Sequence, residues 1–292
     1  MAFIDQLIAQ PYIFYPALFI ASLCIGSFLN VVIHRLPEMM KRDWRSQCEE
    51  FLEYPEDQRT QFDHLGLATP RSRCPHCGHK ITALENIPVI SYLFLRGRCS
   101  GCQAQISPRY PIVELITGVL SVLTVYLLGA QWAGLISLAL VWSLIALTLI
   151  DYDTQLLPDS ITLPLLWLGL VVNYFGQLVP FEDAFWGAIV GYLALWIVYH
   201  LFRILTGKEG MGHGDFKLLS ALGAWLGWQM LPAVILLSSL VGAVVGITLI
   251  LFKGHDRAQP IPFGPYLAAA GLLTLLWGGE LQALWYNFLG VH

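Results

Sequence analysis

Long apolar stretches alternate with short polar loops over most of this chain, and one long polar segment follows the first apolar stretch. An α-helix needs about 20 predominantly apolar residues to cross a lipid bilayer. Eight stretches are predicted to be membrane helices, although the sixth is short: residues 12–34, 111–129, 132–150, 161–178, 184–202, 216–229, 231–252 and 262–279. The pattern therefore predicts an all-α polytopic membrane protein.

The polar segment divides the predicted protein into three parts. We expect residues 1–34 to hold the first transmembrane helix, residues 35–110 to form a small domain in water, and residues 111–292 to form the main membrane-embedded domain. Proline and glycine interrupt the polar segment, which has little apolar sequence from which to build a core. A domain of this kind needs another source of stability.

Composition supports the membrane assignment. Only 12% of the 292 residues are charged and 56% are hydrophobic, whereas a soluble domain carries about 25% charged residues. The first apolar stretch lacks the basic start and the small-residue cleavage site of a signal peptide, so we expect it to remain as a membrane helix. The net charge of −4 identifies no partner.

Lysine and arginine predict the orientation, because they are concentrated in cytoplasmic loops. Eleven of the sixteen lie between Arg35 and Arg109, and eight membrane helices place all sixteen on one side. Leaving out the short sixth helix would break this agreement. We therefore expect the polar segment and the loop "GKEGMGHGD" (207–215) to be cytoplasmic, with both chain ends outside.

Four cysteines in the polar segment have the spacing of a zinc ribbon. They form C-x2-C, then 21 residues, then C-x2-C: Cys74, Cys77, Cys99 and Cys102. Two thiolates from each pair complete a tetrahedral site for Zn²⁺, and four protein ligands indicate a structural metal. Two disulfides are the alternative, but disulfides are rare in the reducing cytoplasm. We expect Cys24 and Cys48 to be inert, and His76 and His79 to be solvated.

Carboxylates at two predicted helix ends are the candidates for catalysis. Asp151 lies in "LIDYDTQLLPD" and Asp215 in "GMGHGDFK", and the topology brings both to the cytoplasmic boundary of the membrane. Two adjacent carboxyl groups share one proton, so one activates water while the other protonates or polarises a peptide bond. The glycines before Asp215 would let a substrate backbone approach closely.

Simpler roles compete with catalysis for several polar residues. Acids at helix ends often just face water, which is our expectation for Asp153 and Asp159. Lys217 is expected to extend toward lipid phosphate. The pairs Gly187/Gly191, Gly223/Gly227 and Gly242/Gly246 predict close helix packing.

Six motifs in this order resemble the type IV prepilin peptidases, which are membrane aspartic proteases of the GxGD type. They are "GSFLNVVIHRLP" (26–37), the double C-x2-C (74–102), "RYPIVELITG" (109–118), "LIDYDTQLLPD" (149–159), "GKEGMGHGDFKLLSALGAWLGW" (207–228) and "PIPFGPYLAAAG" (260–271). The resemblance covers essentially the whole chain. It implies that Asp151 and Asp215 are the catalytic pair, with Asp153 as the nearest rival for the first position.

The resemblance also implies substrates and location. A member of this family cleaves the short basic leader of prepilins and of type II secretion pseudopilins at the cytoplasmic face of the bacterial inner membrane. It then methylates the new N-terminal residue with S-adenosylmethionine, and the complete cysteine set favours this bifunctional type. The expected partners are these substrates and the lipid bilayer, with no nucleic acid. The sequence does not show where the methyl donor binds, and the cytoplasmic segment around the cysteines is the expected location.

Two other classes of function remain open on the residues alone. A proton-coupled transporter would use Asp151 and Asp215 as proton carriers, but it explains neither the cysteine domain nor the shared depth of the two acids. A scaffold would dock cytoplasmic secretion proteins through the cysteine domain and leave the acids structural. Cleavage of a prepilin by the purified protein separates these alternatives.

Overall fold

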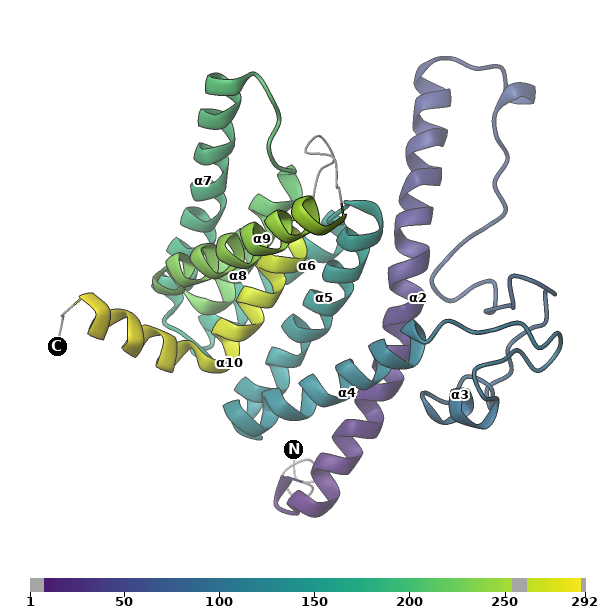
Figure 1. The fold of residues 1–292 in the computed structure, drawn as a ribbon, viewed down its shortest axis with the longest axis horizontal. Helices are drawn as coiled ribbons and strands as arrows, with labels where there is room; N and C mark the ends of the chain where they lie inside the picture. Colours follow the sequence, from purple (N-terminus) through teal and green to yellow (C-terminus); the bar gives the residue numbers. More distant parts are fainter. Residues whose placement is uncertain (1–7, 254–261, 290–292) are drawn as a thin grey trace. The chain divides into compact units, whose positions relative to one another are not determined.

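The computed structural model describes residues 8–253 and 262–289. Residues 260 and 261 of the last sequence motif therefore lie outside the described residues. The chain forms two compact units, Met1–Leu123 and Thr124–His292. Within the described ranges the regular structure is helical, with two isolated β-bridges and no strand (Figure 1). The all-α prediction is confirmed.

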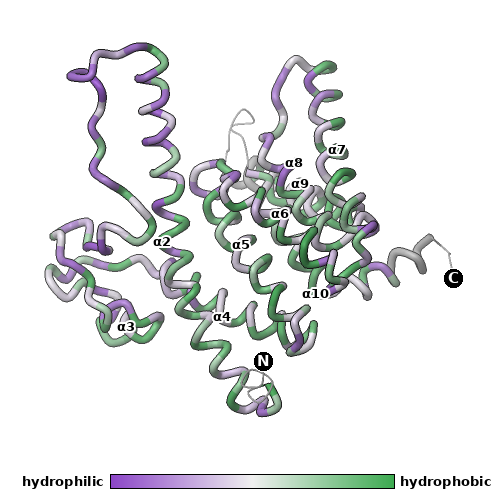
Figure 2. Tube along the Cα trace, turned by 180° about the vertical axis from the view of Figure 1, so that it is seen from behind, coloured by the Kyte–Doolittle hydropathy of each residue, from purple (hydrophilic) through white to green (hydrophobic). Residues whose placement is uncertain are grey.

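The first unit is built on one long helix, α2 (Pro11–Phe51). We expected a membrane helix ending at residue 34, but α2 continues for more than four further turns. Its second half is hydrophilic (Figure 2) and has ion pairs one turn apart, Glu38–Arg42 and Arg45–Glu49. Such pairs stabilise a helix in water. Hydropathy thus located the end of the apolar stretch. The helix itself continues because the ion pairs stabilise its polar half.

Helix α4 (Arg109–Leu128) packs closely against the apolar half of α2. A Cβ added to Gly26 would lie 2.7 Å from the backbone of Glu114, and one added to Gly118 would lie 2.7 Å from the Phe19 ring. Glycine is therefore required where the two helices meet. The cysteine-rich segment lies between the two helices in sequence and contains only a 3-10 turn, Glu56–Gln58, and the short α3 (Ile90–Phe94).

The described part of the second unit contains six α-helices close to the predicted positions, although the last one extends to Leu289 and not to residue 279. They are α5 (Trp132–Thr154), α6 (Asp159–Tyr174), α7 (Phe181–Thr206), α8 (His213–Leu226), α9 (Leu231–Lys253) and α10 (Gly264–Leu289), with a 3-10 turn at Trp228–Met230. Helix α10 is bent at Trp277, whose φ of −131° is not helical.

Five described helices are long and apolar enough to cross a membrane. These are α2, α4, α5, α7 and the stretch Trp228–Thr248, while α6 is apolar but shorter. Helix α8 has only 14 residues and lies against α6, α7 and α10 (Figure 1). Its Leu218, Leu219 and Leu222 are completely buried, so protein covers the faces of this short helix.

Glycines allow α7 and α8 to touch through their backbones. A Cβ on Gly187 would lie 2.2 Å from the Gly223 carbonyl oxygen, and one on Gly191 would lie 2.6 Å from that of Leu219. The packing prediction is confirmed for these three glycines. Gly227 differs, because its φ of +81° ends α8. The buried Asn173 side chain donates to the Ala224 and Trp225 carbonyls at this helix end, which fixes α8 relative to α6.

Candidate active site and four-cysteine cluster

Asp151 and Asp215 are brought together from segments far apart in the sequence. Asp151 lies in the last turn of α5, and Asp215 lies in the first turn of α8. Their exposed fractions are only 5% and 6%. Leu157 lies against both Gly214, which precedes Asp215, and Gly264, which hydrogen-bonds to Asp151. The two acids are therefore buried around the same part of the α5–α6 connection.

The end of α5 separates Asp151 from its neighbour Asp153. The helix continues to Thr154 and ends at Gln155, which adopts the left-handed conformation at φ 55°. Residues two apart on an α-helix point in directions about 200° apart. Asp151 is accordingly buried, while Asp153 is exposed, so Asp153 does not share the buried position beside Asp215.

Glycines at the start of α8 position Asp215 against the α5–α6 connection. Gly212 precedes the helix, and its carbonyl accepts the Asp215 N–H at 3.3 Å. A Cβ on Gly214 would lie 2.6 Å from the Cβ of Leu157, so a larger residue would push the loop away. Oδ1 of Asp215 is buried and has no hydrogen-bond partner among the described residues. That oxygen is available to a substrate or to a shared proton.

Gly264 is a third member of this site that the sequence reasoning did not single out. Its N–H donates to Oδ2 of Asp151 at 2.9 Å, and an added Cβ would lie 2.6 Å from the same oxygen. The motif "PIPFGPYLAAAG" contains it, but a glycine offers no side-chain chemistry to suggest a role. The hydrogen bond fixes one oxygen of Asp151 and leaves the other oxygen of that carboxyl group for chemistry.

Two polar residues near the site differ from expectation. Nζ of Lys217 lies 2.7 Å from both carboxylate oxygens of Asp159. Lys217 therefore ties α8 to α6 instead of reaching for lipid phosphate, and Asp159 is an ion-pair partner as well as a water-facing acid. His213 packs against Tyr199 and Phe216, with ring centroids 5.1 and 5.4 Å away.

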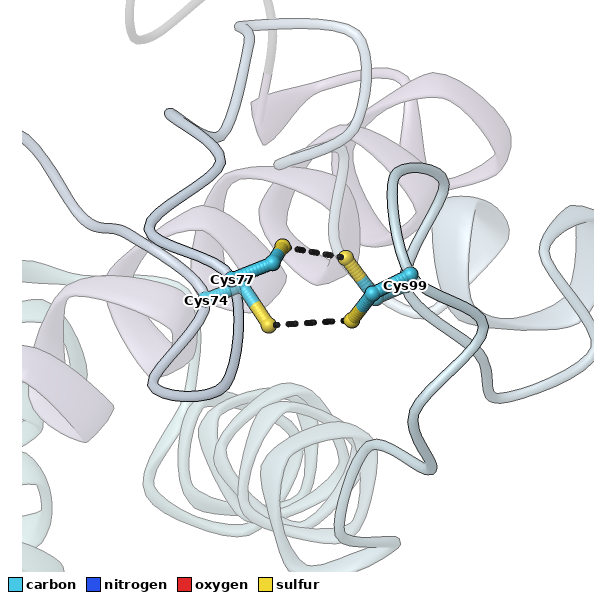
Figure 3. A group of neighbouring side chains, drawn as sticks. Cys74, Cys77 and Cys99 are labelled. Atoms are coloured by element: carbon cyan, nitrogen blue, oxygen red, sulfur yellow. Dashed lines mark hydrogen bonds between the residues drawn. The ribbon is translucent and has the colours of Figure 1, made fainter.

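The four cysteines converge in the first unit (Figure 3). Each pair lies on a turn with the same two backbone hydrogen bonds. The N–H of the first cysteine donates to the carbonyl oxygen five residues later, and the carbonyl oxygen of the same cysteine accepts from the N–H four residues later. The residue after each second cysteine, Gly78 or Gln103, has positive φ. One bridge flanks each turn, Arg73–Lys80 and Arg98–Gln105. The repeated turn aims both pairs at one point.

The sulfur geometry suits a tetrahedral metal ion. All four Sγ atoms lie within 4.8 Å of one another. The contacts Cys74–Cys102 and Cys77–Cys99 measure 3.8 and 3.9 Å. Thiolates at 2.3 Å from a tetrahedral ion lie about 3.8 Å apart. The cluster can therefore hold a metal ion.

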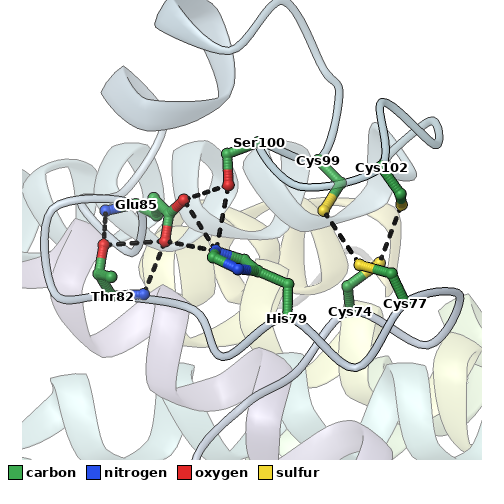
Figure 4. Close-up of polar contacts among 8 residues, drawn as sticks. All are labelled: Cys74, Cys77, His79, Thr82, Glu85, Cys99, Ser100 and Cys102. Atoms are coloured by element: carbon green, nitrogen blue, oxygen red, sulfur yellow. Dashed lines mark hydrogen bonds and ion pairs between the residues drawn. The ribbon is translucent and has the colours of Figure 1, made fainter.

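A polar network supports the first cysteine turn (Figure 4). Glu85 accepts hydrogen bonds from the Thr82 N–H and hydroxyl at 2.8 Å and from the Ser100 hydroxyl. Nε2 of His79 lies 3.2 Å from the same carboxylate. These hydrogen bonds lower the pKa of Glu85 to about 2, and the bond from Ser100 contributes most to this shift. His79 is thus bound within the domain, contrary to expectation, whereas His76 is exposed.

The second unit buries two aspartates at neighbouring helix ends, and the first unit carries a four-cysteine cluster. These features define a polytopic membrane protein of the aspartic-protease class. Residues 138–247 match the model of the Type IV leader peptidase family. Residues 20–128 match that of the Bacterial Peptidase A24 N-terminal domain. The chain belongs to the type IV leader peptidase family.

Several curated relatives align over almost their whole length. A protein of Aeromonas hydrophila is 57% identical over 96% of both chains. Others from Stutzerimonas stutzeri and Pseudomonas aeruginosa are 55% and 50% identical over 98% and 99% of both chains. All three carry the name Prepilin leader peptidase/N-methyltransferase. No solved structure matches this chain significantly.

Proposed function

We propose that this protein cleaves the leader from type IV prepilins and type II secretion pseudopilins, and then methylates the new N-terminal residue. Family membership and the shared name of the relatives support both activities. The observation that carries the peptidase assignment is the buried pairing of Asp151 with Asp215. Neither the transporter nor the scaffold hypothesis has comparable support.

The two carboxyl groups act as one catalytic unit. One, ionised, removes a proton from a water molecule, which attacks the scissile carbonyl carbon. The other, protonated, donates its proton as the peptide bond breaks. Gly264 orients Asp151 through its N–H, and the unpartnered Oδ1 of Asp215 accepts or delivers the proton. Burial excludes bulk water and strengthens both interactions.

The location of the pair fits a substrate held in the membrane. Asp151 ends a helix long enough to span a bilayer, so a substrate anchored by its own apolar helix would present its scissile bond at this depth. The distribution of lysine and arginine supports a cytoplasmic position for this face. The protein would therefore act at the cytoplasmic side of the inner membrane.

We assign Zn²⁺ to Cys74, Cys77, Cys99 and Cys102. Four thiolates leave no open coordination position, so the ion is structural and takes no part in cleavage. It joins two turns that are separated by 21 residues, in a segment whose described helices are only a 3-10 turn and the short α3. Metal binding thus supplies the folding free energy that a small core cannot.

Methylation requires S-adenosylmethionine, which supplies an electrophilic methyl group on a sulfonium ion. Product analysis tests the whole function. Purified protein in detergent is mixed with a full-length prepilin and this methyl donor, and the product is sequenced by mass spectrometry. The proposal predicts a shortened chain that begins after the leader and is methylated on its first nitrogen. An intact prepilin would contradict the peptidase assignment, and a cleaved but unmethylated product would contradict the second activity.

A further inference from the structure

A cavity of about 480 Å³ lies within the first compact unit. Its wall combines residues of α2, both cysteine turns and the start of α4. Small-molecule ligands occupy clefts of roughly 300–1,000 Å³. The cavity is therefore large enough for a ligand of nucleoside size, and nothing in the peptidase mechanism uses it.

Glu114 of α4 places a buried carboxyl group in the wall of this cavity. Its exposed fraction is 8%. Oε2 accepts the Val89 N–H at 2.8 Å, and the Ser27 hydroxyl also donates to the carboxyl group. In the part of the chain that the structure describes, no lysine or arginine forms an ion pair with it. A buried carboxylate without an opposite charge is unfavourable, so a cationic ligand would compensate it.

The other charged residues of the cavity wall have different partners from those of Glu114. Glu85 is already satisfied by Thr82, Ser100 and His79. The Arg35 guanidinium donates a hydrogen bond to the Gly66 carbonyl oxygen at 2.8 Å, so this side chain is held within the first unit. Arg73 lines the cavity and is exposed. The charged wall residues are thus two acids, Glu85 and Glu114, and two arginines, Arg35 and Arg73. Of the two acids, Glu114 is the one whose recorded partners, the Val89 N–H and Ser27, carry no charge.

We propose that this cavity binds the methyl donor, with Glu114 facing the positive charge of its sulfonium group. The proposal rests on the methyltransferase activity proposed above. S-Adenosylmethionine carries a sulfonium ion and an ammonium group at one end, together with a carboxylate that matches the charge of Arg73. Its size suits the measured volume, and its net positive charge suits Glu114.

The position of the cavity also suits the acceptor. Both α2 and α4 are long and apolar enough to cross a membrane, and the cavity lies where they meet the cysteine-rich segment. The Asn30 amide donates to the Tyr110 carbonyl at 3.1 Å, which fixes the wall between the helices. A substrate anchored in the bilayer brings its new amino terminus to this boundary.

Two ligands that differ by one charge test the proposal. S-Adenosylhomocysteine lacks the methyl group and has a neutral thioether in place of the sulfonium ion. Binding of each ligand to the full-length protein in detergent is measured by calorimetry for the wild type, Glu114→Gln and Glu114→Asp. A matched control is Glu50→Gln, which removes an exposed acid of α2 outside the cavity.

We expect Glu114→Gln to weaken binding of the methyl donor about 10-fold or more, as for loss of a hydrogen-bonded charge, and to weaken S-adenosylhomocysteine much less. Glu114→Asp should keep the preference for the charged ligand, and Glu50→Gln should bind both ligands normally. An equal change for both ligands, or no change, would overturn the role of Glu114 while leaving the methyltransferase intact. A wild-type protein that cleaves prepilin but binds neither ligand would overturn the methyltransferase proposal itself.

Discussion

The backbone N–H of Gly264 donates to Oδ2 of Asp151 at 2.9 Å, across more than a hundred residues of sequence. The start of α10 thereby fixes the carboxyl group that ends α5. A main-chain donor can approach this closely because the donor residue has no side chain: an added Cβ would lie 2.6 Å from the same oxygen. Positioning of the candidate catalytic pair therefore depends on a residue without functional groups.

Gly264→Ala should impair cleavage strongly. The new methyl group must displace either Asp151 or the start of α10, and a misplacement of about 1 Å can cost roughly 10²-fold in rate. Gly279→Ala is the matched control, because a Cβ there meets nothing within 4 Å. Cleavage rates of a prepilin by the two variants and the wild type measure the effect. Equal rates for all three would show that the close contact does not position Asp151.

The ion pair between Lys217 and Asp159 should contribute little to stability. Its side chains are 30% and 54% exposed, and exposed pairs are typically worth about 0–1 kcal/mol. A double-mutant cycle with Lys217→Met and Asp159→Asn, followed by thermal unfolding in detergent, measures the coupling. A coupling energy far above 1 kcal/mol would mean that the pair is shielded from solvent in the membrane-bound protein.

Removing the metal should affect the cysteine cluster without affecting the chemistry of peptide cleavage. Because the aspartate pair needs no metal, we expect a chelator to release about one equivalent of zinc and to leave initial cleavage by the folded protein largely intact. Replacing the four cysteines with serine should remove the zinc from the purified protein. Unchanged zinc content in that variant would contradict the assigned ligands, and immediate loss of cleavage on chelation would contradict a purely structural ion.

The low pKa of Glu85 predicts a specific loss of stability in acid. Its hydrogen bonds hold the folded-state pKa at about 2, below the usual 4.5. Their contribution is therefore complete above pH 4.5 and declines as the pH falls from 4.5 toward 2. Amide exchange of Thr82, whose N–H donates to Glu85, should be slower in the wild type than in Glu85→Gln at pH 7. The difference should shrink below pH 4.5; a constant difference would refute the stated cause.

Hydropathy and motif spacing predicted most of the helices and the convergence of the four cysteines, because both depend on local pattern. They failed where a contact between distant segments decides the outcome. The partner of Lys217, for example, lies on another helix. The extension of α2 to Phe51 was missed for a different, local reason: it follows from charge pairs one turn apart, which hydropathy does not record. Gly264 was missed because its contribution is a main-chain hydrogen bond, which leaves no trace in residue chemistry. Burial of Glu114 depends on packing of α4 against α2, which periodicity alone does not specify.

The central claim is that Asp151 and Asp215 together cleave the prepilin. Its most direct test compares initial cleavage rates of the purified wild type with those of Asp151→Asn, Asp215→Asn and Asp153→Asn. Because the two buried carboxyl groups share the work of base and acid, each of the first two variants should lose essentially all cleavage while remaining folded. The exposed Asp153→Asn should retain most of it. Full cleavage by Asp151→Asn or by Asp215→Asn would contradict the pairing.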